Sequence, residues 1–269
     1  MPGTDRLKSL ALRLLPERLL QELRKFHYAR KLRAPASDEP DLAVVRHLVP
    51  AGGWAVDVGA NVGVYTKALS ELVGPWGKVF SVEPVPLTFD VLTSNVRRLR
   101  LGNVQALNCA VSAGHGSVTL EVPRYATGGE NFYEARIVGP DGGGALRRVT
   151  VECRSLDALF ADAARPISFV KCDVEGHELR CLRGAEGLIR RGRPAWLVEV
   201  SGDPDFEPSA AAEVLRLMRG HGYGVFWYDG RELHARRPGE RRTNYFFLTA
   251  AHLALLPPEL RPVSLGLAA

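Results

Sequence analysis

The feature that most constrains the fold is a regular alternation of short apolar runs with helical patterns from residue 54 onward. Apolar residues are nearly continuous within each run, which is typical of strands that helices cover on both faces. The segment that joins the last two runs shows no helical pattern, so we expect these two strands to pair antiparallel at an edge of the sheet. The expected strands are Trp54–Gly59, Lys78–Glu83, Asn103–Ala110, Ile167–Asp173, Ala195–Ser201, Val225–Tyr228 and Tyr245–Leu248. The sequence therefore predicts an α/β domain with a mostly parallel sheet.

Composition divides the chain into a central domain and flanking segments. Residues 1–40 form a basic, leucine-rich arm that ends in a linker of proline, serine and acidic residues. Residues 41–250 hold the alternating pattern and form the predicted domain. Residues 251–269 contain three prolines and are expected to form a peripheral tail.

One insertion interrupts the alternation at residues 117–154, where two β-like runs flank a glycine-rich loop, Thr127–Leu146. Loops of this length usually serve a function or lack order. Asn131, Phe132 and Tyr133 interrupt the run of small residues with polar and aromatic groups. We expect the loop to act as a lid over an acceptor site, with a simple disordered insertion as the alternative.

The charge of the chain is +5 over 269 residues, with 46% apolar and 24% charged residues, values that are ordinary for a folded globular protein. The basic surplus is confined to residues 1–36, so we expect no nucleic-acid partner. No stretch approaches the roughly 20 apolar residues of a membrane span, and basic residues interrupt every candidate signal core. We therefore expect a cytoplasmic protein. Its cysteines, which have no zinc-binding spacing and are expected to stay reduced, are Cys109, Cys153, Cys172 and Cys181.

Leucines recur at helical spacing through residues 5–33, with arginine and lysine between them. Two interpretations remain open. The helix packs on the domain or on a second copy in a homodimer, or it rests on a membrane surface as a peripheral amphipathic arm.

The strongest chemical signal is the run Val56–Gly63, which ends the first strand and opens a helix. Its glycines, Gly59 and Gly63, allow close approach of the backbone to a ligand. Asp57 precedes the first glycine and would repel a pyrophosphate, but it suits a ligand that carries an ammonium and a sulfonium. Glu83 ends the second strand, where a carboxylate can accept hydrogen bonds from ribose hydroxyls. This pair favours S-adenosylmethionine, while a structural turn and a phosphate or dinucleotide site remain alternatives.

A second signal, Phe169–Glu178, lies at the end of another strand and enters a helix. Half of its ten residues can carry charge. A strand end that serves packing alone rarely concentrates so many titratable groups, although acids at a helix N-terminus and a solvated lysine are the alternative. We expect this segment to border the same crevice as the Val56–Gly63 segment, which we call the glycine loop.

Together these segments resemble the FkbM family of S-adenosylmethionine-dependent methyltransferases. The resemblance covers about residues 50–205 and rests on Val56–Gly63, Val82–Pro84, Asn108–Val111 and Lys171–Glu178. It implies the class I methyltransferase fold, with a seven-stranded, mostly parallel Rossmann-like sheet and an antiparallel edge strand. It also implies O-methylation of a hydroxyl on a small metabolite, sugar or glycan.

The resemblance further implies roles for particular residues. Glu83 would hold the ribose, and Asn108 and Ala110 would lie near the adenine. Asp173 and Val174 would face the sulfonium. The residues that would line the methionine end of the cofactor are Asp57, Gly59, Asn61, Gly63 and Tyr65.

Methyl transfer to a hydroxyl needs a group that removes the proton, and the second segment offers three candidates. We rank Asp173 first, His177 second and Glu175 third. Lys171 is expected to pair with a carboxylate such as Glu199. Because salt bridges explain these acids well, we predict no metal site.

Two alternatives to this function remain. The chain would be an N-methyltransferase of a small amine, or a module that binds the cofactor without turnover. The presence of Asp57, Glu83 and Asp173 argues against the second alternative.

Overall fold

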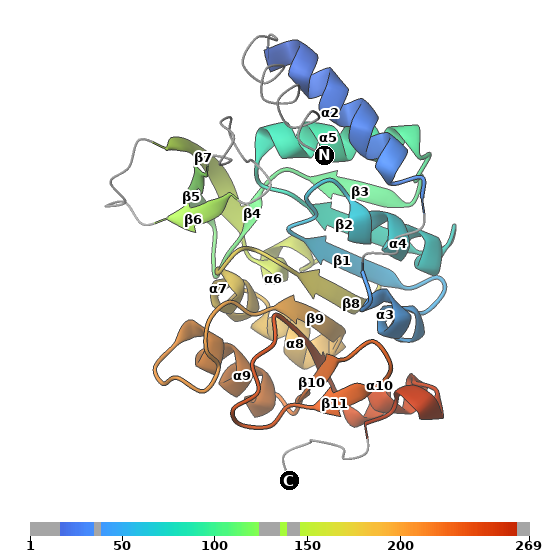
Figure 1. Cartoon of the computed structure of the whole chain (residues 1–269), viewed down its shortest axis with the longest axis vertical. Helices are drawn as coiled ribbons and strands as arrows, with labels where there is room; N and C mark the ends of the chain where they lie inside the picture. The colour runs from blue at the N-terminus through green and yellow to red at the C-terminus, as the bar shows by residue number, and fades with distance from the viewer. Residues whose placement is uncertain (1–16, 35–38, 124–134, 139–145, 263–269) are drawn as a thin grey trace, which may run out of the picture.

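The computed structural model describes residues 17–34, 39–123, 135–138 and 146–262. Within these ranges it shows one large sheet with helices on both faces and a smaller sheet at one side (Figure 1). The expected glycine-rich lid, with Asn131, Phe132 and Tyr133, lies outside the described residues for most of its length.

The large sheet has the order β11-β10-β12-β9-β8-β1-β2-β3. Five neighbouring strands, from β3 to β9, run parallel, whereas β12 is antiparallel to both β9 and β10. The strands are β1 (Trp54–Val58), β2 (Lys78–Val82), β3 (Val104–Leu107), β8 (Ile167–Cys172), β9 (Ala195–Glu199), β10 (Gly224–Tyr228), β11 (Leu233–Ala235) and β12 (Asn244–Leu248). The predicted mostly parallel α/β sheet is confirmed.

The edge of this sheet differs from the expectation in two respects. Within the described ranges the large sheet has eight strands where seven were expected, and the antiparallel β12 lies between β9 and β10 rather than at the edge. The additional strand follows a tight turn in which Asp229 Oδ1 accepts hydrogen bonds from the backbone N–H groups of Arg231 and Glu232. Gly230 adopts a φ of 98° in this turn. An Asp-Gly pair of this kind reverses a strand sharply, so β11 folds back on β10 as a hairpin.

Helices cover both faces because successive side chains of a strand point to opposite sides. Val56 and Val58 of β1 join the apolar core under α7, α8 and α9, while Ala55 joins the core under α3, α4 and α10. The helices are α3 (Leu42–Leu48), α4 (Val64–Val73), α5 (Pro86–Arg98), α6 (Leu156–Leu159), α7 (Glu178–Arg183), α8 (Glu186–Gly192), α9 (Ala210–Gly220), α10 (Ala250–Leu255) and the 3₁₀ turn η2 (Pro258–Leu260).

The smaller sheet comes from the insertion and has the order β4-β7-β5-β6. Its apolar side chains pack against the residues that begin α5, and Leu120 and Val122 are almost fully buried there. Its strands are β4 (Ala110–Val111), β5 (Gly116–Val122), β6 (Arg136–Val138) and β7 (Arg147–Arg154). This packing places the insertion beside the ends of β2 and β3 (Figure 1).

The described part of the N-terminal arm is helix α2 (Glu17–Lys31), which lies along α5 (Figure 1). Gln21 Nε2 donates a hydrogen bond of 2.7 Å to the carbonyl oxygen of Leu87, and Lys25 Nζ lies 2.7 Å from Asp90 Oδ2. Packing on the domain, one of the two interpretations of the arm, therefore holds for this helix.

Three large apolar side chains of α2 are exposed. Leu19, Leu23 and Phe26 are 47%, 51% and 60% exposed and recur at helical spacing. None of the helices in the described ranges has both the length and the apolar character needed to span a bilayer.

Candidate functional site

Two adjoining pockets lie at the carboxyl ends of the central parallel strands. They share Gly59, Asn61 and Asp173 as lining residues. The first, which we call the insertion pocket, encloses about 670 Å³ of space, counting the part open to solvent, and Leu120 and Ile137 of the small sheet form one wall. The second, the arm pocket, encloses about 970 Å³ on the same basis. Crevices at this end of a parallel sheet commonly bind nucleotides.

The glycine loop separates the two pockets. Gly59 has a φ of 78°, and a Cβ atom at this position would lie 1.7 Å from the carbonyl oxygen of Asp173. Only glycine fits such close packing of two loops. Asn61 also adopts a positive φ, of 50°, a conformation that asparagine tolerates better than most residues.

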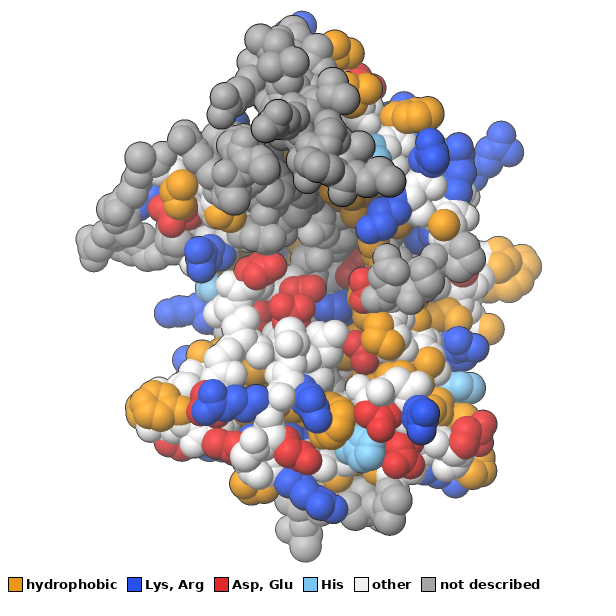
Figure 2. All heavy atoms as spheres, in the orientation of Figure 1, with side chains coloured by type: hydrophobic (Ala, Val, Ile, Leu, Met, Phe, Trp, Pro, Cys, Tyr) orange, Lys and Arg blue, Asp and Glu red, His pale blue; other side chains and the backbone are white. Residues whose placement is uncertain are grey.

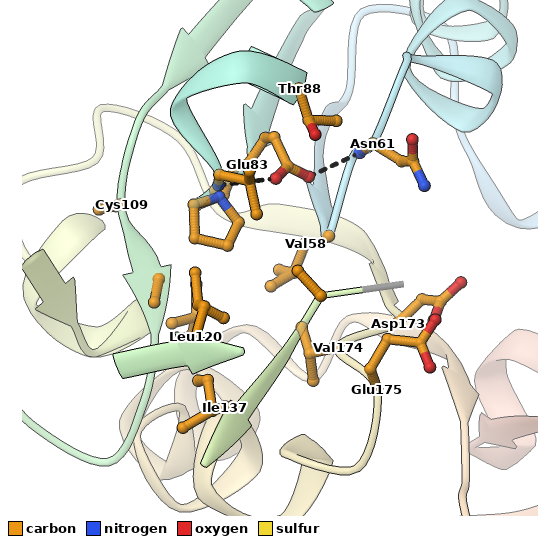
Figure 3. Close-up of a pocket in the computed structure, with 17 residues that line it drawn as sticks. Val58, Asn61, Glu83, Thr88, Cys109, Leu120, Ile137, Asp173, Val174 and Glu175 are labelled. Atoms are coloured by element: carbon orange, nitrogen blue, oxygen red, sulfur yellow. Dashed lines mark hydrogen bonds between the residues drawn. The ribbon is translucent and has the colours of Figure 1, made fainter. Parts of the chain in front are cut away.

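Glu83 is the central polar group of the insertion pocket (Figure 3). Its carboxylate accepts hydrogen bonds from the backbone N–H groups of Asn61, at 3.0 Å, and Val85, at 2.8 Å. Burial raises the pKa of Glu83 to about 7 despite these bonds. Each carboxylate oxygen has a second lone pair, so the group can still accept bonds from a ligand in the pocket.

Asp57 lies in the arm pocket and is held from one side by the hydroxyl of Thr66, 2.6 Å away. That hydroxyl is also 2.8 Å from the hydroxyl of Ser81. Burial raises the pKa of Asp57 to about 6. These buried contacts connect Asp57 on β1 with α4 and β2, so its carboxylate has a structural role as well as facing the pocket.

Lys171 and Asp173 form an ion pair where β8 ends, with Lys171 Nζ 3.1 Å from Asp173 Oδ2. Lys171 is buried, and its ammonium also lies 5.1 Å from the centre of the Tyr65 ring. Lys171 thus pairs with a neighbouring carboxylate, as expected, and this carboxylate is that of Asp173, two residues further along the chain.

Most of the remaining predicted residues line one of the two pockets. Ala110, Val174 and Glu175 line the insertion pocket, and Tyr65 lines the arm pocket. Gly63 begins α4 with a φ of 99°.

Asn108 and His177 do not line either pocket. The amide of Asn108 donates hydrogen bonds to the carbonyl oxygens of Glu83, at 2.8 Å, and Pro84, at 3.1 Å. It therefore supports the backbone around Glu83, the residue expected to hold the ribose. His177 Nε2 lies 3.0 Å from the hydroxyl of Ser112. Burial lowers the pKa of His177.

Several residues that line the two pockets were not predicted from the sequence. Leu120 and Ile137 reach the insertion pocket from the small sheet, and Tyr28 and Glu39 reach the arm pocket from the arm and its linker. Both pairs lie far along the chain from the glycine loop, and neither belongs to a motif. Among the residues that the structure describes, no three His, Cys, Asp or Glu side chains are grouped as a metal site would require.

Comparison with known proteins identifies the family. The profile described as the methyltransferase FkbM domain matches residues 57–225, which include both pockets' shared residues. The chain belongs to the FkbM methyltransferase family. It therefore carries a methyltransferase domain that depends on S-adenosylmethionine.

Individual relatives of this FkbM chain cover part of its length. The hexuronic acid methyltransferase AglP of Haloferax volcanii is 34% identical over 135 residues, which are 50% of this chain and 50% of the relative. The methyltransferase sdnD of Sordaria araneosa is 26% identical over 162 residues and 62% of its own length. The matched stretches thus span between half and about three-fifths of these relatives. The solved FkbM methyltransferase of Methylobacillus flagellatus KT is 16% identical, with a TM-score of 0.48 over 74% of this chain and 44% of that chain.

The residues present in this FkbM domain fit the cofactor. Glu83 offers buried acceptor positions beside apolar side chains such as Leu120 and Ile137, as a ribose and an adenine need. Asp57 offers negative charge to an ammonium, and Gly59 contributes only backbone atoms to the lining of both pockets.

Proposed function

We propose that this domain methylates a hydroxyl group of a small metabolite, sugar or glycan. The observation that carries the proposal is the position of Asp173, which borders both pockets and is tethered by Lys171. A carboxylate at that boundary can reach an acceptor hydroxyl placed in the arm pocket. The relative named as a hexuronic acid methyltransferase supports a sugar-like acceptor.

In this proposal the insertion pocket holds the adenosine half of the cofactor. Glu83 accepts hydrogen bonds from the ribose hydroxyls. Leu120 and Ile137, together with Ala110 and Val174, enclose the adenine in apolar surface. Asp57 and the loop at Gly59 lie on the side of the methionine ammonium.

When bound, S-adenosylmethionine supplies a methyl group that is activated by its sulfonium. The protein must hold the acceptor oxygen about 3 Å from the methyl carbon and in line with the bond that breaks. Asp173 orients the acceptor hydroxyl and accepts its proton as the new carbon–oxygen bond forms. Glu175, at the rim of the insertion pocket, is a second candidate, while His177 is directed to Ser112.

The test is calorimetric binding of S-adenosylhomocysteine, followed by methyl transfer to a matched set of alcohols and amines. We expect transfer to hydroxyl groups. Transfer to amines alone would make the protein an N-methyltransferase, and binding without transfer to either class would make it a non-catalytic module.

For the arm we propose peripheral contact with an anionic membrane through α2. Its exposed face combines Leu19, Leu23 and Phe26 with Arg30 and Lys31, a composition that suits the boundary between acidic headgroups and acyl chains.

A further inference from the structure

The arm pocket carries more negative charge than the cofactor can balance. Among the lining residues that the structure describes, four are carboxylates, and the single ammonium, on Lys171, is already engaged by Asp173 at 3.1 Å. S-adenosylmethionine brings two positive groups and one carboxylate, so an acidic excess remains after it binds. Acidic side chains gather near the middle of this face of the molecule (Figure 2). The four carboxylates belong to Glu39, Asp57, Asp173 and Glu199.

The acids lie at two distinct places in this pocket. Asp57 is on β1, beside the glycine loop, and is the register partner of Lys171. Glu199 is the register partner of Asn244, on β9 and β12. Across the sheet from Asp57 on β1, Glu199 on β9 is two strands away, roughly 10 Å, and Asn244 on β12 is three strands away, roughly 14 Å. Glu199 and Asn244 therefore lie beyond the part of the pocket assigned to the methionine ammonium.

Unsatisfied buried atoms point to a ligand in the same pocket. Tyr65 is only 8% exposed, and its hydroxyl forms no hydrogen bond of normal geometry within the described residues. Burial raises the pKa of Tyr65, and the nearby carboxylate of Glu39 raises it further. The amide oxygen of Asn244 is also buried without a partner there, while its nitrogen donates to Asp41 at 2.7 Å. An acceptor atom left without a donor is costly unless a ligand supplies one.

The linker and α2 complete the wall on this side. Glu39 lies three residues before α3 begins at Leu42, and Tyr28 comes from α2. Aromatic rings such as that of Tyr28 attract cations. Burial raises the pKa of Glu39, and burial together with the neighbouring Asp173 raises that of Glu199 to about 7, even though Lys171 opposes both shifts.

We propose that the outer part of the arm pocket, between Glu39 and Glu199, binds an acceptor that carries a cationic amine beside the hydroxyl to be methylated. This inference rests on the proposed O-methyl transfer and adds the charge class of the acceptor. An ammonium there donates to Glu39, Glu199 and the Asn244 amide oxygen, whereas a carboxylate would face the like charges of Glu39 and Glu199. An amino sugar or another amino alcohol has this chemistry.

The experiment uses three methyl pyranosides that share their ring hydroxyls and differ at one position, which carries an ammonium, a neutral acetamide or a carboxylate. Binding of each is measured on the full chain saturated with S-adenosylhomocysteine, and kcat/KM for methyl transfer is measured with S-adenosylmethionine. We expect the ammonium compound to exceed the carboxylate compound at least about tenfold in both measurements, and the preference to weaken as salt screens the charges. Glu39→Gln should reduce the preference for ammonium over acetamide by about threefold or more.

The matched control is Glu71→Gln, which removes an equally negative but exposed side chain that pairs with Lys67 outside the pocket. It should leave the preference unchanged. Equal or better binding of the acetamide or carboxylate compound overturns the inference, as does an unchanged preference in Glu39→Gln, even when hydroxyl methylation occurs. Preferred binding of the ammonium compound without any methyl transfer would instead contradict the proposed function. It would still support the inference that this pocket binds a cationic ligand.

Discussion

Lys171 Nζ lies 3.1 Å from Asp173 Oδ2, so a buried lysine near the end of β8 holds the carboxylate that follows the strand at the boundary between the two pockets. Lys171 is buried and Asp173 is partly exposed. The ammonium therefore acts as an anchor from inside the domain, and the carboxylate is presented outward. A proton acceptor for methyl transfer needs both a fixed position and access to the acceptor.

Loss of Asp173 should slow the chemical step. We expect Asp173→Asn to reduce the single-turnover rate of methyl transfer at least about tenfold, or ~1.4 kcal/mol of barrier. His177→Ala should change that rate much less, because the ring contacts Ser112 outside the pockets. Both variants must first be shown to bind S-adenosylhomocysteine. A slow His177→Ala with an unaffected Asp173→Asn would reverse the roles proposed here.

Loss of the anchor should act through Asp173. Lys171→Met should lower kcat more than it raises KM for the acceptor, since Asp173 remains but loses its fixed position. Lys171→Arg, which keeps the positive charge, should recover part of the rate. If Lys171→Met lowers the rate as far in an Asp173→Asn background as in the native chain, the two residues act independently.

The cofactor site should depend on Asp57. Asp57→Asn keeps the size of the side chain and should weaken S-adenosylhomocysteine binding about tenfold or more, measured by calorimetry. Ser81→Ala is the matched control, because it changes the same buried hydroxyl network one step away from the pocket. Gly59→Val should lower the melting temperature as well, since its side chain would collide with the carbonyl oxygen of Asp173.

The buried carboxyls should make stability fall as pH rises. Asp57 and Glu83 have pKa values of about 6 and about 7 in the folded chain, above those of ordinary carboxyls. The folded state therefore retains protons that the unfolded chain releases, and the free energy of unfolding of the ligand-free protein should decrease between about pH 5 and pH 8. Urea unfolding at several pH values measures this slope.

Cofactor affinity should have the opposite trend. The ionised form of Glu83 accepts ribose hydrogen bonds best, so S-adenosylhomocysteine should bind more tightly at pH 8 than at pH 6. In Glu83→Gln both pH dependences should flatten. An unchanged slope in this variant would show that another group controls them.

The membrane proposal predicts that the chain sediments with vesicles that contain phosphatidylglycerol but not with phosphatidylcholine vesicles. Replacing Leu19, Leu23 and Phe26 by serine should abolish sedimentation without loss of cofactor binding, since these side chains face away from the domain. Trp76→Ser, a change at a residue that is 84% exposed elsewhere, is the control. Concentration-dependent dimerisation that the triple variant removes would assign the face to a second copy instead.

The two strands β11 and β12 near the edge of the large sheet differ in how far the local sequence explains their positions. Asp229-Gly230 is a hairpin signal that the sequence contains, and it accounts for β11. The position of β12 between β9 and β10 has no comparable local signal. Strand order depends on which edges remain free to pair after the parallel strands assemble, and that is a property of the whole sheet.

Motifs within the cofactor site were recognisable because each occupies a short stretch of chain. Asp57, Gly59 and Asn61 lie within five residues, and backbone strain at Gly59 explains the glycine. The roles of Asn108 and His177 could not be read in this way. Their side chains are directed by contacts with the loop after β2 and with Ser112, which the sequence does not place beside them.

By itself the sequence determined the α/β class, the family and the two segments that carry the charged groups, since hydrophobic periodicity and short motifs are local properties of the chain. Only the tertiary structure decided that Lys171 pairs with Asp173, that Leu120 encloses one pocket, and that Glu39 reaches the other. The physical reason is that a pocket is formed by surfaces that pack together from distant parts of the chain, and packing depends on strand register and helix position rather than on proximity in sequence.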